Sequence, residues 1–307
     1  AFGEWFLADL QGRRGDAYRA AQAFERAAAG ASPSAIAVAA REAGRFNRPK
    51  EALGKLRHID TDHGWLRNFT LFWEEWAGAF HVVGDHRAEL DKALEARARF
   101  PESPEAIRAE VRARAALGQP EEVERLVEEA MSSFQDGAEA ADVAWVGAQE
   151  LAAHGQVPAA AATRGVALEW LAHCESLTAE GNLLRVRLLL ESGDAGGARR
   201  LLETLPPLRD LNWLALQGLV AASLGDTTTA RDAGARLEAM DNPYLSGQHL
   251  LHAAGIRVAL GEPELAVQTL RRAFAAGLPH GVDLHALPVF APLVERRDFR
   301  GILRPRG

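Results

Sequence analysis

The sequence contains a single cysteine, Cys174, among its 307 residues. One thiol cannot form a disulfide within the chain and cannot supply a cysteine-based zinc site, so neither device holds this protein together. We expect the thiol to be buried and inert, because the neighbouring His173 alone is weak support for a reactive thiolate. Stability must therefore come from apolar packing.

Long apolar segments and a basic excess are also missing. No run of 18 or more apolar residues occurs, which excludes a membrane-spanning helix of ordinary length. The formal net charge of −7 at pH 7 lacks the basic excess typical of nucleic-acid binding proteins, so we expect no nucleic-acid partner. No signal-peptide pattern is present, and we expect a cytoplasmic protein. Since the sequence starts at Ala1 rather than Met, excision from a longer protein is one alternative.

Motifs that carry chemistry are missing as well. Glycine-rich nucleotide loops and serine-centred nucleophile elbows do not occur. The segment His58–His63 is rich in His and Asp, but its spacing matches neither a zinc motif nor a calcium loop. We interpret it as a solvated loop, and we interpret His280, Asp283 and His285 in the same way. The sequence thus predicts no enzyme, no cofactor and no metal site.

The chain is rich in alanine and leucine, and glycine recurs at regular intervals along it. Hydrophobic residues make up 48% and charged residues 25% of the sequence, a balance typical of a protein with a full core. Alanine is abundant and β-branched residues are sparse, which favours helix along the whole chain. We therefore expect an all-α fold.

An internal repeat organises these helices. Gly261 ends one helix, since a residue just past a helix end often takes a left-handed conformation, and Pro263 begins the next helix. The earlier turn positions are Gly15, Asn47, Gly84, Gly118, Gly155, Gly193 and Gly225, and successive turns are 32, 37, 34, 37, 38, 32 and 36 residues apart. Eight such units exceed the roughly three that a solenoid needs to bury a continuous core.

The second helix of each unit carries a small-large-small apolar face. In the last unit this face is Ala266, Leu270 and Ala273, at the spacing of one side of a helix. The first unit repeats it with Ala20, Phe24 and Ala27, and the second with Ala52, Leu56 and Ile59. In the third unit we place Leu90 and Leu94 on this face, with a slip of one residue.

This pattern resembles the tetratricopeptide repeat family, whose unit is a helix-turn-helix of about 34 residues. The third unit also keeps large and small residues in its first helix, as Trp73, Ala77 and Phe80. The resemblance covers about residues 1–277 and implies a right-handed superhelical solenoid of about eight hairpins. We expect residues 278–307 to form a separate segment that caps the last hairpin.

The C-terminal segment has a resemblance of its own. Leu287-Pro288-Val289-Phe290 and Arg297-Asp298-Phe299 are similar to the closing segment of repeat domains fused to bacterial serine/threonine kinases, adenylate cyclases and winged-helix regulators. In that family an aspartate-proline pair precedes each aromatic residue, and this chain departs from the pattern at both places. The resemblance implies the docking or sensory part of a bacterial signalling protein.

Six of the chain's 21 aromatic residues lie between Trp65 and Phe80. Trp73, Trp76, Ala77 and Phe80 are spaced as the buried stripe of a helix, so we assign them to the core. Trp65 and Phe69 are left for a partner. The alternative is an aromatic pocket for a small molecule.

The tetratricopeptide resemblance implies that the first helices line a concave groove. Aligning every unit on its turn places the following residues there: Trp5, Asp9, Glu74, Arg108, Arg112, Trp145, Gln149, Arg187 and His252. Arg108 and Arg112 are one helical turn apart and could clamp a carboxylate. We therefore expect a non-catalytic scaffold that holds a peptide or protein segment of unknown identity. The alternatives are a small-molecule sensor and self-association through the N-terminal face at residues 1–12.

Overall fold

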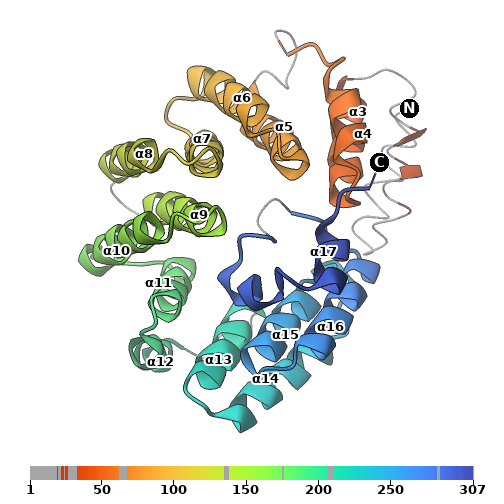
Figure 1. Ribbon diagram of the computed structural model, residues 1–307. Helices are drawn as coiled ribbons and strands as arrows, with labels where there is room; N and C mark the ends of the chain where they lie inside the picture. Colours follow the sequence, from red (N-terminus) through yellow and green to blue (C-terminus); the bar gives the residue numbers. More distant parts are fainter. Residues whose placement is uncertain are drawn as a thin grey trace.

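The protein is an array of helical hairpins that follow one another in chain order (Figure 1). The structure, a computed structural model, describes residues 19, 22, 23, 25, 26, 33–61, 68–134, 138–174, 176–206, 211–281 and 284–306. Within these residues all regular structure is helical, as the sequence predicts, and no strand occurs. None of the described helices is long and apolar enough to span a membrane.

Seven hairpins are described. They pair α3 (Pro33–Arg45) with α4 (Pro49–Leu56), α5 (Thr70–Val83) with α6 (His86–Arg99), α7 (Pro104–Ala116) with α8 (Pro120–Ser133), α9 (Glu139–Ala153) with α10 (Val157–His173), α11 (Ala179–Glu191) with α12 (Ala195–Thr204), α13 (Leu211–Ser223) with α14 (Thr227–Glu238), and α15 (Gln248–Ala259) with α16 (Pro263–Ala275). A short 3-10 helix, η2 (Pro243–Leu245), precedes α15. The unit predicted around Gly15 lies outside the described residues, apart from five of its positions.

The predicted turns are confirmed at every described position. Asn47, Gly84, Gly118, Gly155, Gly193, Gly225 and Gly261 all have positive φ angles, between 59° and 85°. At Gly118 the two bonds that close a helix end are both made: the Gly118 amide donates to Ala115 O at 3.0 Å and the Gln119 amide to Arg114 O at 3.0 Å. Glycine adopts this conformation without steric cost, which explains its recurrence.

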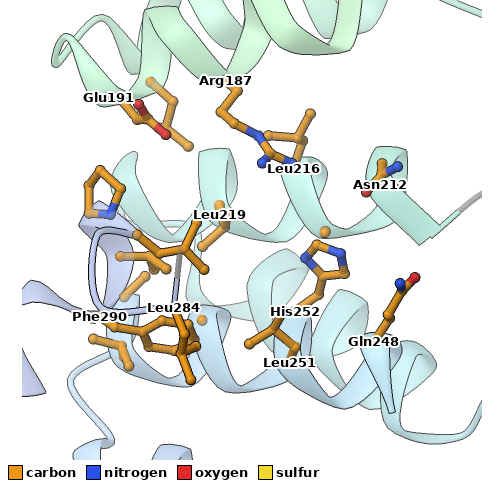
Figure 2. A pocket seen from close by; sticks show the side chains of 18 of the residues that line it. Arg187, Glu191, Asn212, Leu216, Leu219, Gln248, Leu251, His252, Leu284 and Phe290 are labelled. Carbon is orange, nitrogen blue, oxygen red and sulfur yellow. The ribbon is translucent and has the colours of Figure 1, made fainter. Parts of the chain in front are cut away.

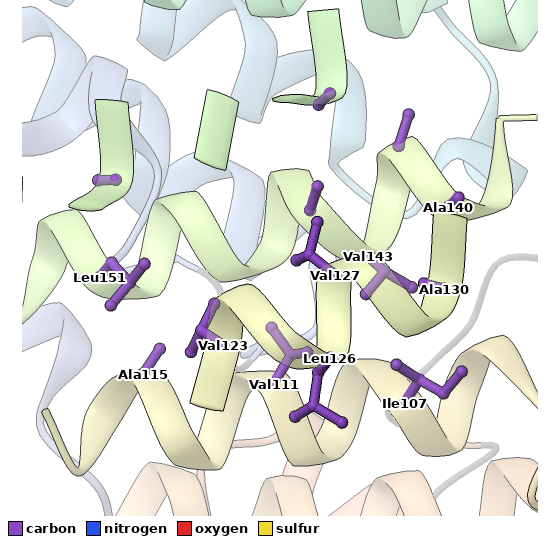
Figure 3. Packing of buried hydrophobic residues seen from close by; sticks show 14 of the residues in the cluster. Ile107, Val111, Ala115, Val123, Leu126, Val127, Ala130, Ala140, Val143 and Leu151 are labelled. Carbon is purple, nitrogen blue, oxygen red and sulfur yellow. The ribbon is translucent and has the colours of Figure 1, made fainter. Parts of the chain in front are cut away.

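The small-large-small face is buried where the structure describes it. Ala266, Leu270 and Ala273 are fully buried, and Trp73, Trp76 and Ala77 form the predicted core stripe of α5. Phe80 is partly buried beside them. The largest apolar cluster lies in the middle of the array, where α7 to α10 meet, and Figure 3 shows its interdigitating side chains.

Two further expectations concern the exposure of Trp65 and Phe69 and the burial of Cys174. Trp65 lies outside the described residues, whereas Phe69 is 38% exposed at the start of α5. Cys174 is only partly buried, and its thiol donates to Trp170 O at 3.4 Å. The thiol therefore sits nearer the surface than we expected.

The predicted one-residue slip in the third unit is wrong. Leu94 is 41% exposed, while Glu89, Ala93 and Ala96 are buried on α6. The register is thus the same as in the other units. It assigns Glu89 to a core position that the other described units fill with Ala52, Val123, Ala160, Ala198, Ala230 and Ala266. A search for apolar residues missed this register because the first of its three buried positions is the charged residue Glu89.

The array bends into a ring that its C-terminal segment closes (Figure 1). Buried Phe290, Leu293 and Phe299, from η3 (Pro288–Leu293) and α17 (Arg297–Leu303), pack against α15 and α16. The end of the chain then reaches the first described hairpin, where the Arg306 amide donates to Asn47 O at 2.7 Å. The segment therefore contacts the last hairpin and the beginning of the array at once.

Candidate functional site

A cavity of about 840 Å³ opens on the inner side of the ring. Its walls are α9, α11, α13 and α15, the first helices of four successive hairpins, together with residues 278–281 and 284–292 of the C-terminal segment. Along this part of the array the first helices lie on the inner side of the ring and the second helices on the outer side (Figure 1). Side chains of the first helices therefore line the cavity. A cavity of this volume lies in the range that proteins use for ligands.

The floor of the cavity is apolar. Leu216 and Leu219 come from α13, Leu251 from α15, and Leu284 and Phe290 from the C-terminal segment (Figure 2). Pro288 and Pro292 complete this side. The floor offers a place for one or more apolar groups, whose transfer from water is favourable by about 25 cal/mol per Å².

One wall is polar and is built on α9 and α11. The guanidinium of Arg187 lies over the indole of Trp145, 5.0 Å from the ring centroid. Trp145 Nε1 donates to the carboxylate of Glu191, with distances of 3.2 and 3.3 Å to its two oxygens. Burial raises the pKa of Glu191 above its usual range, although Arg187 and the indole N–H oppose this effect. The wall therefore holds a cation and a carboxylate that protonates more readily than usual.

The opposite wall carries neutral hydrogen-bonding groups. His252 stands on α15, where burial and then the charge of Arg187 lower its pKa to about 4. The imidazole is thus neutral at pH 7 and can both donate and accept a hydrogen bond. Asn212 and Gln248, at the starts of α13 and α15, are exposed at the cavity edge (Figure 2).

The structure brings together three of the predicted groove residues. Trp145, Arg187 and His252 all line this cavity. Glu74 and Arg108 lie elsewhere, on α5 and α7, where Arg108 Nη1 is 2.6 Å from Asp142 Oδ2 and its Nε is 3.9 Å from Glu74 Oε1. Trp5 and Asp9 lie outside the described residues.

Arg112 and Gln149 do not face an open groove as we expected. Their exposed fractions are only 4% and 2%. Arg112 Nε donates to Glu89 Oε1 at 2.7 Å, so this guanidinium is paired with a buried carboxylate of its own chain. The expected arginine clamp would have to break that pair and the bond between Arg108 and Asp142 before it could hold a ligand's carboxylate.

The sequence analysis missed several cavity residues. Asn212 and Gln248 each lie thirteen residues before their turn glycines, one helical turn beyond the positions that we aligned. Extending the alignment by that turn would have found both. Leu284 and Phe290 carried no such signal, because their segment was assigned only a capping role.

Groups suited to metal binding lie outside this cavity. The described residues contain two sets of His and Glu whose ligand atoms are within 4.8 Å of one another, and both lie around His81. His280 and His285 lie in a loop, as we expected, but both are partly buried and contact other parts of the chain. His280 stacks on Phe274 with centroids 4.0 Å apart, and His285 Nε2 is 3.4 Å from the buried carboxylate of Glu150. Asp283 lies outside the described residues.

Comparison with known proteins adds a likeness of fold. No protein-family model and no curated protein matches the chain. Among solved structures, a tetratricopeptide repeat protein from Parabacteroides merdae is similar, with 12% sequence identity and a TM-score of 0.48. The similarity covers 89% of this chain and 98% of that one. The helical-repeat architecture itself rests on the hairpins described above.

Proposed function

We propose that the protein is a non-catalytic scaffold that holds an extended segment of a partner protein in the cavity between α9, α11, α13 and α15. The observation that carries this proposal is the arrangement of an apolar floor below exposed amide side chains on successive first helices. Helical-repeat arrays build curved surfaces of this kind for binding.

Asn212 and Gln248 suit the backbone of an extended segment. A side-chain amide donates and accepts, so it can pair with both the N–H and the C=O of one peptide unit. These two residues occupy the same register in neighbouring repeats, which spaces them along the groove. An apolar side chain of the bound segment would enter the floor formed by Leu216, Leu219 and Leu251.

A phage-displayed library of short random peptides, panned on the purified chain, tests this proposal. We expect selected peptides to share a bulky apolar residue. The Asn212→Ala, Gln248→Ala double variant should bind them about tenfold or more weakly, since each lost hydrogen bond contributes about 1 kcal/mol. Isothermal titration calorimetry with a synthetic copy of a selected peptide measures the difference.

Gln268→Ala is the matched control, because Gln268 is an exposed amide on α16 and does not line the cavity. It should bind like the wild type. Failure to select any peptide, or equal binding by the double variant, would contradict the proposal.

A small apolar molecule is the second candidate occupant. It is favoured by the C-terminal segment, whose Leu284 and Phe290 cover one side of the cavity and make it more enclosed than an open groove. Native mass spectrometry of the chain purified from its own cells would reveal such a molecule as a fixed added mass. A role in a bacterial signalling protein rests on the resemblance of the C-terminal segment alone, and self-association through residues 1–12 concerns residues that the structure does not describe.

A further inference from the structure

A second cavity, of about 370 Å³, gathers histidine in an unusual density. Five of the chain's ten histidines line it: His81, His86, His154, His280 and His285. They come from α5, α6, the end of α9 and the C-terminal segment, and His81 and His285 are 204 positions apart in sequence. We call this the histidine cavity.

Three ligand-type groups meet at its inner end. His81 Nε2 lies 3.4 Å from His285 Nε2 and 3.6 Å from Glu150 Oε1. His285 Nε2 is in turn 3.4 Å from Glu150 Oε2. Four tetrahedral ligands at about 2.0–2.1 Å from a zinc ion stand roughly 3.3–3.4 Å from one another. The 3.4 Å between the two imidazole nitrogens matches the separation of two ligands of one ion, and each nitrogen lies 3.4–3.6 Å from a different oxygen of Glu150.

The hydrogen bonding of His81 directs a lone pair into this space. His81 is buried, and a neutral imidazole, the form that binds a metal, carries a single ring proton. His81 Nδ1 is 2.8 Å from Glu89 Oε2, a carboxylate oxygen that can only accept. The single ring proton therefore belongs on Nδ1, and Nε2 presents its lone pair to His285 and Glu150.

Glu150 also faces this point with an acceptor. It is 2% exposed, and its Oε2 lies 3.4 Å from His285 Nε2 and 3.5 Å from His154 Nε2, without the geometry of a hydrogen bond to either. At the equivalent repeat position α7, α11, α13 and α15 have Ala113, Leu188, Val220 and Ile256, whereas α3 has the buried Glu42, which is paired with Arg41 and Arg45. A buried carboxylate oxygen beside a lone pair calls for a cation between them.

We propose that His81, His285 and Glu150 bind a divalent transition-metal ion of the zinc class, with a water molecule in the fourth position. His154 Nε2 lies 3.5 Å from Glu150 Oε2, but His154 belongs to neither set of groups whose ligand atoms are all within 4.8 Å of one another, so it does not complete the site. Imidazole nitrogens with a carboxylate suit Zn²⁺ and its first-row neighbours, whereas Mg²⁺ and Ca²⁺ prefer oxygen ligands. The proposal departs from the sequence analysis, which predicted no metal.

Glu89 and Arg112 hold the ring of His81 in place through the Nδ1 atom that faces away from the proposed ion. Metal-binding imidazoles usually donate their other N–H to a carboxylate, which fixes the ring orientation. Glu89 has this role toward His81 and is itself held by Arg112 Nε at 2.7 Å. This contact explains a glutamate at a repeat position that otherwise holds alanine or valine.

The other possible group, formed by His81, His86 and Glu89, is less suited to an ion. Glu89 Oε2 already accepts from both imidazoles, at 2.8 and 3.2 Å, and its Oε1 accepts from Arg112. Its charge is therefore balanced by a guanidinium. Glu150, in contrast, forms its ion-pair contacts with imidazoles.

An ion at this point would join the C-terminal segment to the first half of the ring. His285 belongs to that segment, while His81 and Glu150 belong to α5 and α9. Binding would stabilise the closed ring, because an ion that requires all three ligands favours the state that brings them together.

Isothermal titration calorimetry of ZnCl₂ into the chelator-treated chain is the direct test. We expect one ion per chain, no comparable binding of MgCl₂, and a rise of the melting temperature with Zn²⁺. Co²⁺ in place of Zn²⁺ should give the visible absorption of a tetrahedral site. His285→Ala should lose more than 100-fold in Zn²⁺ affinity, and Glu89→Gln about 10–100-fold.

His173→Ala is the matched control, because His173 is exposed on α10 and lies outside the cavity. It should bind Zn²⁺ like the wild type. Since His285 is half-exposed in a loop, its variant should keep its helical circular dichroism. Wild-type chain that binds no Zn²⁺, or a folded His285→Ala that binds as tightly as the wild type, would overturn the proposal.

Discussion

Some charged side chains are buried inside the array, and Glu89 is one at a position where the other described units have alanine or valine. Glu89 and Arg112 illustrate why this is tolerated. Burial raises the pKa of Glu89, but Arg112 and the imidazoles of His81 and His86 outweigh it and lower the pKa to about 2. Removing one member leaves the other buried without a partner, which costs more than the pair itself contributes.

His252 provides a pH test at this scale. Its pKa of about 4 in the folded chain lies below the ordinary value of about 6.5. Between these values the unfolded chain binds a proton that the folded chain excludes, so the free energy of unfolding increases with pH across this window. Stability from this residue is complete above about pH 6.5 and is lost as the pH falls toward 4.

Two-dimensional NMR of the imidazole C–H groups measures this value, with His252→Gln to assign the signal. We expect His252 to titrate near 4, and the variant to show a smaller drop in urea stability between pH 7 and pH 5. Titration of the assigned signal above pH 6 would refute the description of this wall of the cavity as neutral.

At the scale of elements, the hairpins pack closely around Gly147 of α9. A methyl group added to Gly147 of α9 would stand 2.8 Å from Val111 Cγ1 and 3.1 Å from Val123 Cγ1, closer than carbon atoms pack. Gly165 of α10 is also helical, but nothing lies within 4 Å of the same added carbon. Both glycines are therefore helical, but only Gly147 lies against neighbouring side chains.

We therefore expect opposite effects from the same substitution. Gly147→Ala should lower the free energy of unfolding by about 1–3 kcal/mol, because α7 and α8 must move aside. Gly165→Ala should raise it by about 0.5–1 kcal/mol, since alanine restricts the unfolded chain and favours helix. Urea denaturation measures both. A stabilising Gly147→Ala would show that α9 does not contact α7 and α8 as described.

At the scale of the whole molecule, closure of the ring depends on contacts between its two ends. Asn47 is the one described hairpin turn without glycine, and its side chain serves this closure. Asn47 Nδ2 donates to Arg304 O at 2.8 Å and lies 3.4 Å from Ile302 O. Asparagine tolerates the left-handed conformation, so Asn47 can form the turn and also hydrogen-bond to the C-terminal segment.

Asn47→Gly should keep the turn and weaken the closure. Loss of a buried hydrogen bond of about 1 kcal/mol corresponds to roughly fivefold faster amide exchange in residues 297–306. Exchange within α7 to α10 should stay unchanged, which hydrogen–deuterium exchange mass spectrometry resolves by segment. Gly118→Asn, which places asparagine in a turn distant from the C-terminal segment, is the control. Unaltered exchange at residues 297–306 in Asn47→Gly would mean that the side chain does not hold the ring.

The local structure of this protein follows from its sequence alone. A turn residue with positive φ and a buried face at fixed offsets recur in every described unit, because both follow from helix geometry within about 35 residues. The same periodicity found Trp145, Arg187 and His252, which share one face of their helices with their repeat equivalents. Periodicity of apolar residues did not predict that Glu89 of the third unit is buried, because a charged residue at a core position breaks the apolar pattern.

How the two ends of the array meet, in contrast, depends on the tertiary structure. Each repeat contributes a small rotation, and their sum over seven hairpins brings the C-terminal segment to Asn47 and His285 to His81. No local pattern encodes that sum. The C-terminal wall of the larger cavity and the whole histidine cavity depend on it, since their side chains come from parts of the chain that are neighbours only in space.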